Sequence, residues 1–310
     1  MQAAGQILNQ MIQYFLMLLM GAGIVKAGVL KAEDSRVLSA VSVYLVVPCA
    51  ILNAFQIEMS GETASGFLLA FEAAAVIHAL LLVLTEILGR VFRLNEVQKV
   101  SFMYSNAGTL VIPLVLGTLG EEWLIYTSSF ISVQTVLLWT HGKSLLCGER
   151  SVDLRKILCS MNVISIVTGI VLFILQIQFP PVIRGTLSAV GGMLGPVGMF
   201  VIGMLLTEED LKQVFTNRGN YGVTALRLLF CPVFMLLVLR LTGAVSLHPQ
   251  ARTLFFISFL ACAMPSAVSI TQMAQVFGKD AAQAGAINIV STLLCILTLP
   301  LMTALYWAAV

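Results

Sequence analysis

The polar residues with the clearest chemical potential lie inside apolar stretches, close to prolines. One stretch reads SFMYSNAGTLVIPLVLGTLG and holds Asn106, Gly108 and Pro113. Proline removes a backbone hydrogen bond from a helix and glycine eases unwinding, so this pattern predicts a broken helix. The N–H groups freed at the break, together with the Asn106 amide, are suited to donate hydrogen bonds to an anion such as a carboxylate.

A second stretch has the same character. It reads ACAMPSAVSITQMAQ, in which Ser266 follows Pro265. Freed backbone groups are costly in hydrocarbon unless protein or water satisfies them. Prolines of this kind can simply kink helices for packing. Two of them at corresponding places in the two halves of the chain favour a binding site between the breaks.

Glu72 is the acidic residue that we expect deepest within an apolar segment. It lies about six residues inside GFLLAFEAAAVIHALLL, roughly 9 Å from the end of the helix at 1.5 Å per residue. Such a group costs up to about 3 kcal/mol to insert and is functional by default, which predicts a proton-coupling carboxylate. The alternative is a glutamate that reaches the membrane interface or lines a site passively. Glu86 differs, because Arg90 follows four residues later and is expected to pair with it.

Two amides lie in other apolar stretches. Gln134 occurs in FISVQTVLLWTHG, and Asn288 has Ser291 and Thr292 on the same helical face. A buried amide must find hydrogen-bond partners. Contact with a bound carboxylate and hydrogen bonds between helices, worth about 1 kcal/mol each, fit the pattern equally well.

The elements that hold these residues must be membrane helices. Of the 310 residues, 59% are hydrophobic and 10% are charged, and the mean hydropathy is +0.97, which leaves too few polar residues for a soluble surface. The net charge of +2 comes without a basic stripe, which excludes nucleic-acid binding. The six cysteines occur singly, without a CxxC pair, and predict neither a metal site nor a disulfide framework.

We expect ten membrane spans, since a bilayer core of about 30 Å needs about 20 apolar residues per helix. The first stretch lacks the basic region and cleavage site of a signal peptide and is expected to remain in the chain. The connections are short, so no soluble domain is inserted between spans. The expected spans are 8–28, 37–55, 66–89, 98–117, 123–145, 157–178, 185–206, 221–242, 252–276 and 281–308.

The distribution of Lys and Arg predicts the orientation, because cytoplasmic connections hold the excess. The connections after the even spans hold three such residues, Arg184, Arg240 and Arg252, whereas Arg227 lies near the start of the eighth span. Both termini are therefore expected outside the cytoplasm. The connections after the odd spans hold thirteen: Lys26, Lys31, Arg36, Arg90, Arg93, Lys99, Lys143, Arg150, Arg155, Lys156, Lys212, Arg218 and Lys279.

Prolines also reveal a repeat. Pro196 follows Pro48 by 148 residues, and Pro265 follows Pro113 by 152 residues, both close to half the chain. Five spans in each half make an odd number, so the second half enters the membrane from the opposite side. We therefore expect two inverted five-helix repeats, residues 1–156 and 157–310. Inverted repeats are typical of secondary transporters.

Glycines recur in the seventh expected span. They occupy positions 191, 192, 195, 198 and 203, including a Gly-x-x-x-Gly spacing. This pattern favours close helix packing, within a scaffold or at a dimer contact, over chemistry.

The segment NAGTLVIPLV, residues 106–115, resembles the N-x-G-x-x-x-x-P-L motif in the fourth helix of the auxin efflux carrier family, which includes the bacterial malate and malonate permeases. YLVVPCAIL, FVIGMLL, AMPSAV and STLLCILTLPLM are similar to other helices of that family. The resemblance implies an all-α polytopic membrane protein of ten helices, with helices 4 and 9 broken and crossing at their prolines. It also implies that helices 3–5 and 8–10 move against a dimeric scaffold of helices 1, 2, 6 and 7, and that the cargo is a small organic anion. The short loops look more like those of the bacterial permeases.

We therefore expect a multi-pass secondary transporter of the cell membrane that exchanges a small carboxylate, coupled to H⁺ or Na⁺, and that works as a homodimer. The alternatives are a carrier like the bile-acid sodium symporters, a channel, or a sensor that does not transport. The chain has no P-loop, HExxH or GxSxG motif, so we expect no ATPase, no enzyme and no cofactor. We expect Glu72 to couple protons; the expected substrate residues are Asn106, Gly108, Pro113, Gln134, Pro265, Ser266 and Asn288.

Overall fold

The computed structural model describes residues 2–56, 60–148, 161–207, 214 and 216–310. Within these residues the secondary structure is helical except for one isolated β-bridge. Four predicted loop cations, Arg150, Arg155, Lys156 and Lys212, lie outside the described residues, as do the predicted boundary between the two repeats and the start of the sixth span.

Helices occupy the predicted spans of the first half. They are α1 (Gln2–Lys26), α2 (Ser35–Val41), which continues through the π-helical turn η2 (Ser42–Val46) into α3 (Val47–Ala54), α4 (Gly61–Val91), α5 (Glu96–Met103), α6 (Ala107–Thr118) and α7 (Leu124–Leu137), which continues through the π-helical turn η4 (Leu138–Gly142) into α8 (Lys143–Cys147). Short 3₁₀ turns, η1 (Ala32–Asp34) and η3 (Glu121–Trp123), precede α2 and α7.

The second half follows the same course. Its helices are α10 (Met161–Ile174), α11 (Pro181–Gly191), α12 (Leu194–Leu206), α14 (Arg218–Ala225), which continues through the π-helical turn η5 (Leu226–Phe230) into α15 (Cys231–Thr242), α16 (Ala251–Ala263), α17 (Val268–Val276) and α18 (Ala281–Ala309). The 3₁₀ turn η6 (Ala244–Ser246) follows α15.

Five helical segments of the described chain are long and apolar enough to cross a membrane. They are Ala32–Ala54, Gly61–Val91, Pro181–Leu206, Arg218–Thr242 and Ala281–Ala309. Shorter apolar helices cover Ile12–Lys26, Ala107–Thr118, Val163–Ile174 and Ala251–Ala263. The helical ranges agree with the predicted spans, while the arrangement of ten spans as two inverted repeats stays a prediction.

Side-chain caps fix where two helices begin at the same end of the molecule. Asn95 and Gln98 form a reciprocal capping box at the start of α5, with N···O distances of 2.9 and 3.1 Å. The Asp280 carboxylate accepts from the Gln283 N–H at the start of α18, at 2.9 Å. A 2.8 Å hydrogen bond from the Asn95 amide to Gln283 joins these two helix starts.

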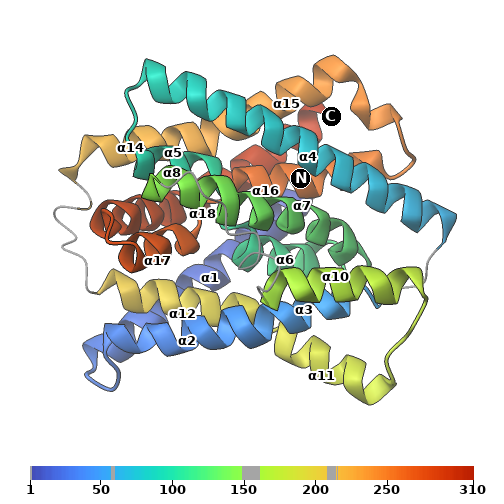
Figure 1. Cartoon of the computed structure of the whole chain (residues 1–310), viewed down its shortest axis with the longest axis horizontal. Helices are drawn as coiled ribbons and strands as arrows, with labels where there is room; N and C mark the ends of the chain where they lie inside the picture. Colours follow the sequence, from blue (N-terminus) through green and yellow to red (C-terminus); the bar gives the residue numbers. More distant parts are fainter. Residues whose placement is uncertain (1, 57–59, 149–160, 208–213, 215) are drawn as a thin grey trace.

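The helices form two sides with a layer between them. Figure 1 shows α2, α3, α10, α11 and α12 along one side of the molecule, and α4, α14 and α15 along the other. The contacts agree with this view: α1 packs on α12, α3 packs on α10 and α11, and α4 packs on α7 and α16. The broken helices α5–α6 and α16–α17 lie within this assembly, so their polar breaks are enclosed by protein.

Glycines let the helices approach closely, as their spacing predicts. A Cβ at Gly203 of α12 would overlap the carbonyl oxygen of Leu18 in α1, and a Cβ at Gly21 of α1 would overlap the backbone of Phe200. A Cβ at Gly195 would lie 3.1 Å from the Pro113 ring of α6. The glycines of α12 thus serve packing within the chain, against α1 and α6.

Candidate functional site

Two unwound segments meet in the core of the molecule. The first, Tyr104–Asn106, separates α5 from α6, and the second, Met264–Ala267, separates α16 from α17. The Asn106 N–H donates to the Pro265 carbonyl oxygen at 2.8 Å, and the Ala267 N–H donates to the Tyr104 carbonyl oxygen at 3.1 Å. These bonds form an antiparallel bridge in which Ser105 faces Ser266. The fourth and ninth expected spans are therefore both broken, and they cross at their breaks.

The two prolines differ in their position relative to the breaks. Pro265 lies in the unwound segment, but Pro113 lies inside α6, which begins at Ala107. The expectation that both helices cross at their prolines is therefore right for Pro265 and wrong for Pro113. A proline removes only one helical hydrogen bond, here the one to the carbonyl of Thr109, so a helix can contain it. The first break lies upstream, where a side chain from α7 compensates for the lost backbone bonds.

That side chain is Gln134. Its Oε1 accepts from the Ser105 N–H at 3.2 Å and from the Ser105 hydroxyl at 2.8 Å, and its Nε2 donates to the Ser105 carbonyl oxygen at 2.9 Å. The Gln134 amide thus forms hydrogen bonds with the N–H, the hydroxyl and the carbonyl oxygen of Ser105. Of the two interpretations of Gln134, the geometry shows the interhelical hydrogen bonds.

Asn288 and Ser291 of α18 form hydrogen bonds with the backbone of Ser266 in the second break. The Asn288 Nδ2 donates to the Ser266 carbonyl oxygen at 2.6 Å, and the Ser266 N–H donates to the Ser291 hydroxyl at 3.2 Å. The helix that follows each broken helix in the chain therefore supports its unwound serine. This correspondence agrees with the two halves being related repeats.

Asn106, at the crossing, has a side-chain donor without a partner among the described residues. It is 5% exposed, its Oδ1 accepts from the Thr109 hydroxyl, and its buried Nδ2 has no hydrogen-bond partner among the described residues. The Ser266 hydroxyl is likewise buried without a partner there. Buried polar groups without partners are costly, and they are therefore candidates for binding a ligand.

The start of α6 adds donors beside Asn106. The first N–H groups of a helix have no partner within it, and they form its positive dipole end. Gly108 is half-buried, and a Cβ built on it would meet nothing within 4 Å, so open space lies next to this first turn. An amide donor and a helix N-terminus beside open space are suited to a carboxylate or another small anion.

Arg227 contacts the crossing, although it is not among the predicted site residues. It lies in the π-helical turn η5 and is 1% exposed; it is the only Lys, Arg, Asp or Glu side chain buried among the described residues. Its guanidinium donates to both broken helices, to carbonyl oxygens of Phe102 at 2.8 Å, Met103 at 3.2 Å, Met264 at 3.0 Å and Ala261 at 3.3 Å. A lone Arg inside the apolar run GVTALRLLFCPVF was the available signal, because a charge within a span is functional by default.

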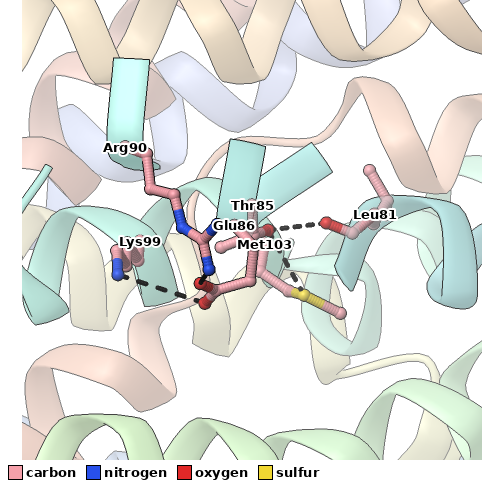
Figure 2. A network of polar contacts seen from close by, with 6 residues as sticks. All are labelled: Leu81, Thr85, Glu86, Arg90, Lys99 and Met103. Carbon is pink, nitrogen blue, oxygen red and sulfur yellow. Dashed lines mark hydrogen bonds and ion pairs between the residues drawn. The ribbon is translucent and has the colours of Figure 1, made fainter. Parts of the chain in front are cut away.

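A polar network holds α5 against α4 near this point, as Figure 2 shows. Glu86 pairs with Arg90 and also with Lys99 of α5, each at 4.0 Å, which confirms the expected pair and adds a second cation. The Thr85 hydroxyl lies 2.6 Å from the Leu81 carbonyl oxygen and 3.5 Å from the Met103 sulfur. Met103 thus contacts both Thr85 of α4 and Arg227 of η5.

Glu72 lies apart from the crossing. It is exposed on α4, whereas the face of α4 that packs into the core includes Ala74, His78 and Thr85. His78 is fully buried, with its ring 4.6 Å from Phe130, and its Nδ1 lies 2.7 Å from the Ala74 carbonyl oxygen. The structure therefore does not bring Glu72 together with the other predicted site residues, and its role in coupling stays a prediction.

Three polar residues of the crossing are buried in this conformation. Ser105, Asn106 and Ser266 are each exposed by 5% or less. Two open grooves of about 720 and 620 Å³ border the start of α5, and none of their lining residues belongs to the unwound segments. The two grooves are therefore separate from the crossing.

Membrane-length apolar helices around two broken helices that cross in the core define a multi-pass membrane protein. The sequence profile of the membrane transport protein family, the family of the auxin efflux carriers, matches residues 6–151 and 149–303. The chain belongs to this family, and the resemblance drawn from its motifs is confirmed. The members of the family are transporters, which agrees with the expectation that the chain is not an enzyme. No individual curated protein matches the chain.

Proposed function

We propose that this membrane transporter is a secondary active carrier that moves a small organic anion, a carboxylate, across the cell membrane by alternating access. The observation that carries the proposal is the Asn106 Nδ2, which has no partner among the described residues and lies at the crossing, next to the N-terminus of α6. Both groups favour negative charge, and the only buried formal charge in the described core is the cation Arg227. A carboxylate would supply the missing acceptor and the missing negative charge together.

Alternating access follows from the architecture that we propose. Ten spans form two inverted repeats, residues 1–156 and 157–310, with both termini outside the cytoplasm. The matching supports of Ser105 by Gln134 and of Ser266 by Asn288 favour this repeat. Helices 3–5 and 8–10 move against a scaffold of helices 1, 2, 6 and 7, which pairs with the scaffold of a second copy. The burial of Ser105, Asn106 and Ser266 fits an occluded stage of that movement.

We further propose that transport is coupled to an ion, with Glu72 as the proton-binding group. Its depth in the apolar helix α4 supports this role, because a carboxylate there is costly unless it is used. Its exposed position, away from the crossing, requires that the coupling act through movement of α4 and not through direct contact with the substrate.

A thermal-shift screen tests the proposed binding site. Purified protein is heated with a panel of mono- and dicarboxylates that includes malate and malonate. We expect at least one of them to raise the Tm of the wild-type protein, because a ligand that binds only the folded state stabilises it. In Asn106→Ala the carboxylate should bind roughly ten- to over a hundredfold more weakly, since a hydrogen bond to a charged group is lost.

Asn220→Ala is the matched control. Asn220, in the first turn of α14, is also a buried asparagine, but its Nδ2 donates to the Val214 carbonyl oxygen, and neither residue belongs to the unwound segments. This variant should have a lower Tm than the wild type and an unchanged affinity for the carboxylate. If Asn106→Ala binds the carboxylate as the wild type does, the site does not lie at the crossing. If no carboxylate shifts the wild-type Tm, the proposed substrate class is wrong.

A further inference from the structure

The carbonyl groups around Arg227 belong to helix ends. Phe102 and Met103 end α5, while Ala261 and Met264 lie at the end of α16 and just beyond it. The last carbonyl groups of a helix have no partner within it and form its negative dipole end. The crossing thus brings two negative helix ends, one from each half of the chain, onto a single point.

Such a point is suited to a cation. In secondary transporters built around broken helices, unwound carbonyl groups and the C-terminal ends of half-helices coordinate the coupling ion. Hard cations favour carbonyl and carboxylate oxygens. In this chain the same kind of oxygen set surrounds the side chain of Arg227, which supplies the positive charge from the neighbouring helix.

The positive charge at this point is permanent. A guanidinium group stays protonated in proteins. No carboxylate of the described residues lies within 4.0 Å of it, since the ion pairs found there involve only Glu86 with Arg90 and Lys99. The burial of Arg227 also keeps bulk counter-ions away. Among the described residues, the charge is therefore offset by the carbonyl groups of the helix ends and not by a carboxylate.

We propose that Arg227 acts as a tethered cation that takes the place of a coupling sodium ion at the crossing, so that the protein binds its anion without sodium. The inference rests on the proposed function for the identity of the anion, but the cation site itself does not depend on it. Arg227 positions the two half-helix ends and offsets the negative charge of the carboxylate; it need not touch the substrate.

The shape of the side chain matters for this role. Arg227 uses Nε, Nη1 and Nη2 on two different helices, which the planar fork of a guanidinium allows and the single ammonium of lysine does not. Arg227→Lys should therefore resemble Arg227→Ala more than the wild type, although it keeps the charge.

The first measurement uses wild-type protein. Its Tm, and its affinity for the carboxylate found in the screen, are measured with sodium chloride and with choline chloride at equal ionic strength. We expect both quantities to be the same in the two salts. A Tm or an affinity that falls when choline replaces sodium would overturn the proposal. The protein would then bind sodium even though Arg227 is present.

The second measurement is chemical rescue. Arg227→Ala removes the guanidinium and leaves its space, and its Tm should fall by roughly 5 °C or more. Ethylguanidinium or sodium at millimolar concentration should raise this Tm, whereas choline should not. The control Arg240→Ala, an exposed arginine of the same transmembrane segment, should show no cation-specific change. A folded Arg227→Ala that responds equally to all three cations would contradict the proposal.

The two proposals fail in different ways. If no carboxylate binds in any salt, the substrate class is wrong, yet the rescue of Arg227→Ala can still be observed because its readout requires no anion. If Arg227→Ala does not fold, the comparison of sodium and choline on the wild-type protein decides the matter alone.

Discussion

At the scale of the residue, the crossing separates polar groups that build the site from those that remain available to a ligand. The amides of Gln134 and Asn288 donate hydrogen bonds to the carbonyl oxygens of Ser105 and Ser266. The Asn106 Nδ2 has no acceptor among the described residues. The sequence predicted all three amides as substrate contacts, Asn106 because it lies at a predicted break and the other two because buried amides need partners. It left the two uses of Gln134 and Asn288 open, since hydrogen-bond partners on other helices are a property of the fold.

Gln134→Ala should destabilise the protein more than it affects substrate specificity. It leaves the N–H, the hydroxyl and the carbonyl oxygen of Ser105 buried without their partner. Each such group costs about 1–3 kcal/mol. We expect the Tm in detergent to fall by several degrees, whereas the control Gln13→Ala, at an exposed position of α1, should leave it unchanged. A Gln134→Ala protein as stable as the wild type would mean that the break does not need this support.

Glu72→Gln tests the coupling role. The variant imitates a protonated glutamate, so it should still exchange substrate while losing acceleration by an imposed pH gradient. Uptake driven by a proton gradient and exchange without a gradient are measured on the same proteoliposomes. Unchanged acceleration in Glu72→Gln would leave this residue the passive role that its exposed position on α4 also allows.

At the scale of the element, apolar stretches and turn residues were enough to predict the helices, but not the exact place of a break. α4, predicted at 66–89, runs from Gly61 to Val91, and α18, predicted at 281–308, runs from Ala281 to Ala309. The fourth span breaks at Tyr104–Asn106, upstream of Pro113. There the hydrogen bonds of Gln134 replace the helical hydrogen bonds that unwinding removes. The π-helical turn that presents Arg227 was also not predictable, since it depends on packing against the half-helix ends.

Gly203→Ala tests the close packing of α12 on α1. A methyl group there would overlap the Leu18 carbonyl oxygen, which is backbone and cannot move aside alone. Overpacking of this kind costs about 1–3 kcal/mol, so the Tm should fall. Gly23→Ala is the control, because a Cβ there meets nothing within 4 Å and alanine favours the helix by about 0.5–1 kcal/mol. Equal Tm values for the two variants would show that the two helices can separate without loss.

At the scale of the whole molecule, composition and hydropathy predicted a multi-pass membrane protein, and the family match over residues 6–151 and 149–303 confirms a membrane transporter. The two sides in Figure 1 enclose a crossing that has breaks in both halves of the chain and a buried cation between their C-terminal ends. The substrate does not follow from the sequence, because many small carboxylates suit an amide donor, a helix N-terminus and one positive charge.

Counterflow in proteoliposomes tests most directly whether this crossing carries a carboxylate across the membrane. Vesicles are loaded with the unlabelled carboxylate that raises the Tm most, and a trace of labelled compound is added outside. We predict that the label accumulates transiently above its outside concentration with wild-type protein and with Asn220→Ala, and that Asn106→Ala slows this accumulation roughly ten- to over a hundredfold at limiting substrate. Label that only equilibrates, as through a channel, or that does not enter at all, would contradict a carrier built around the crossing.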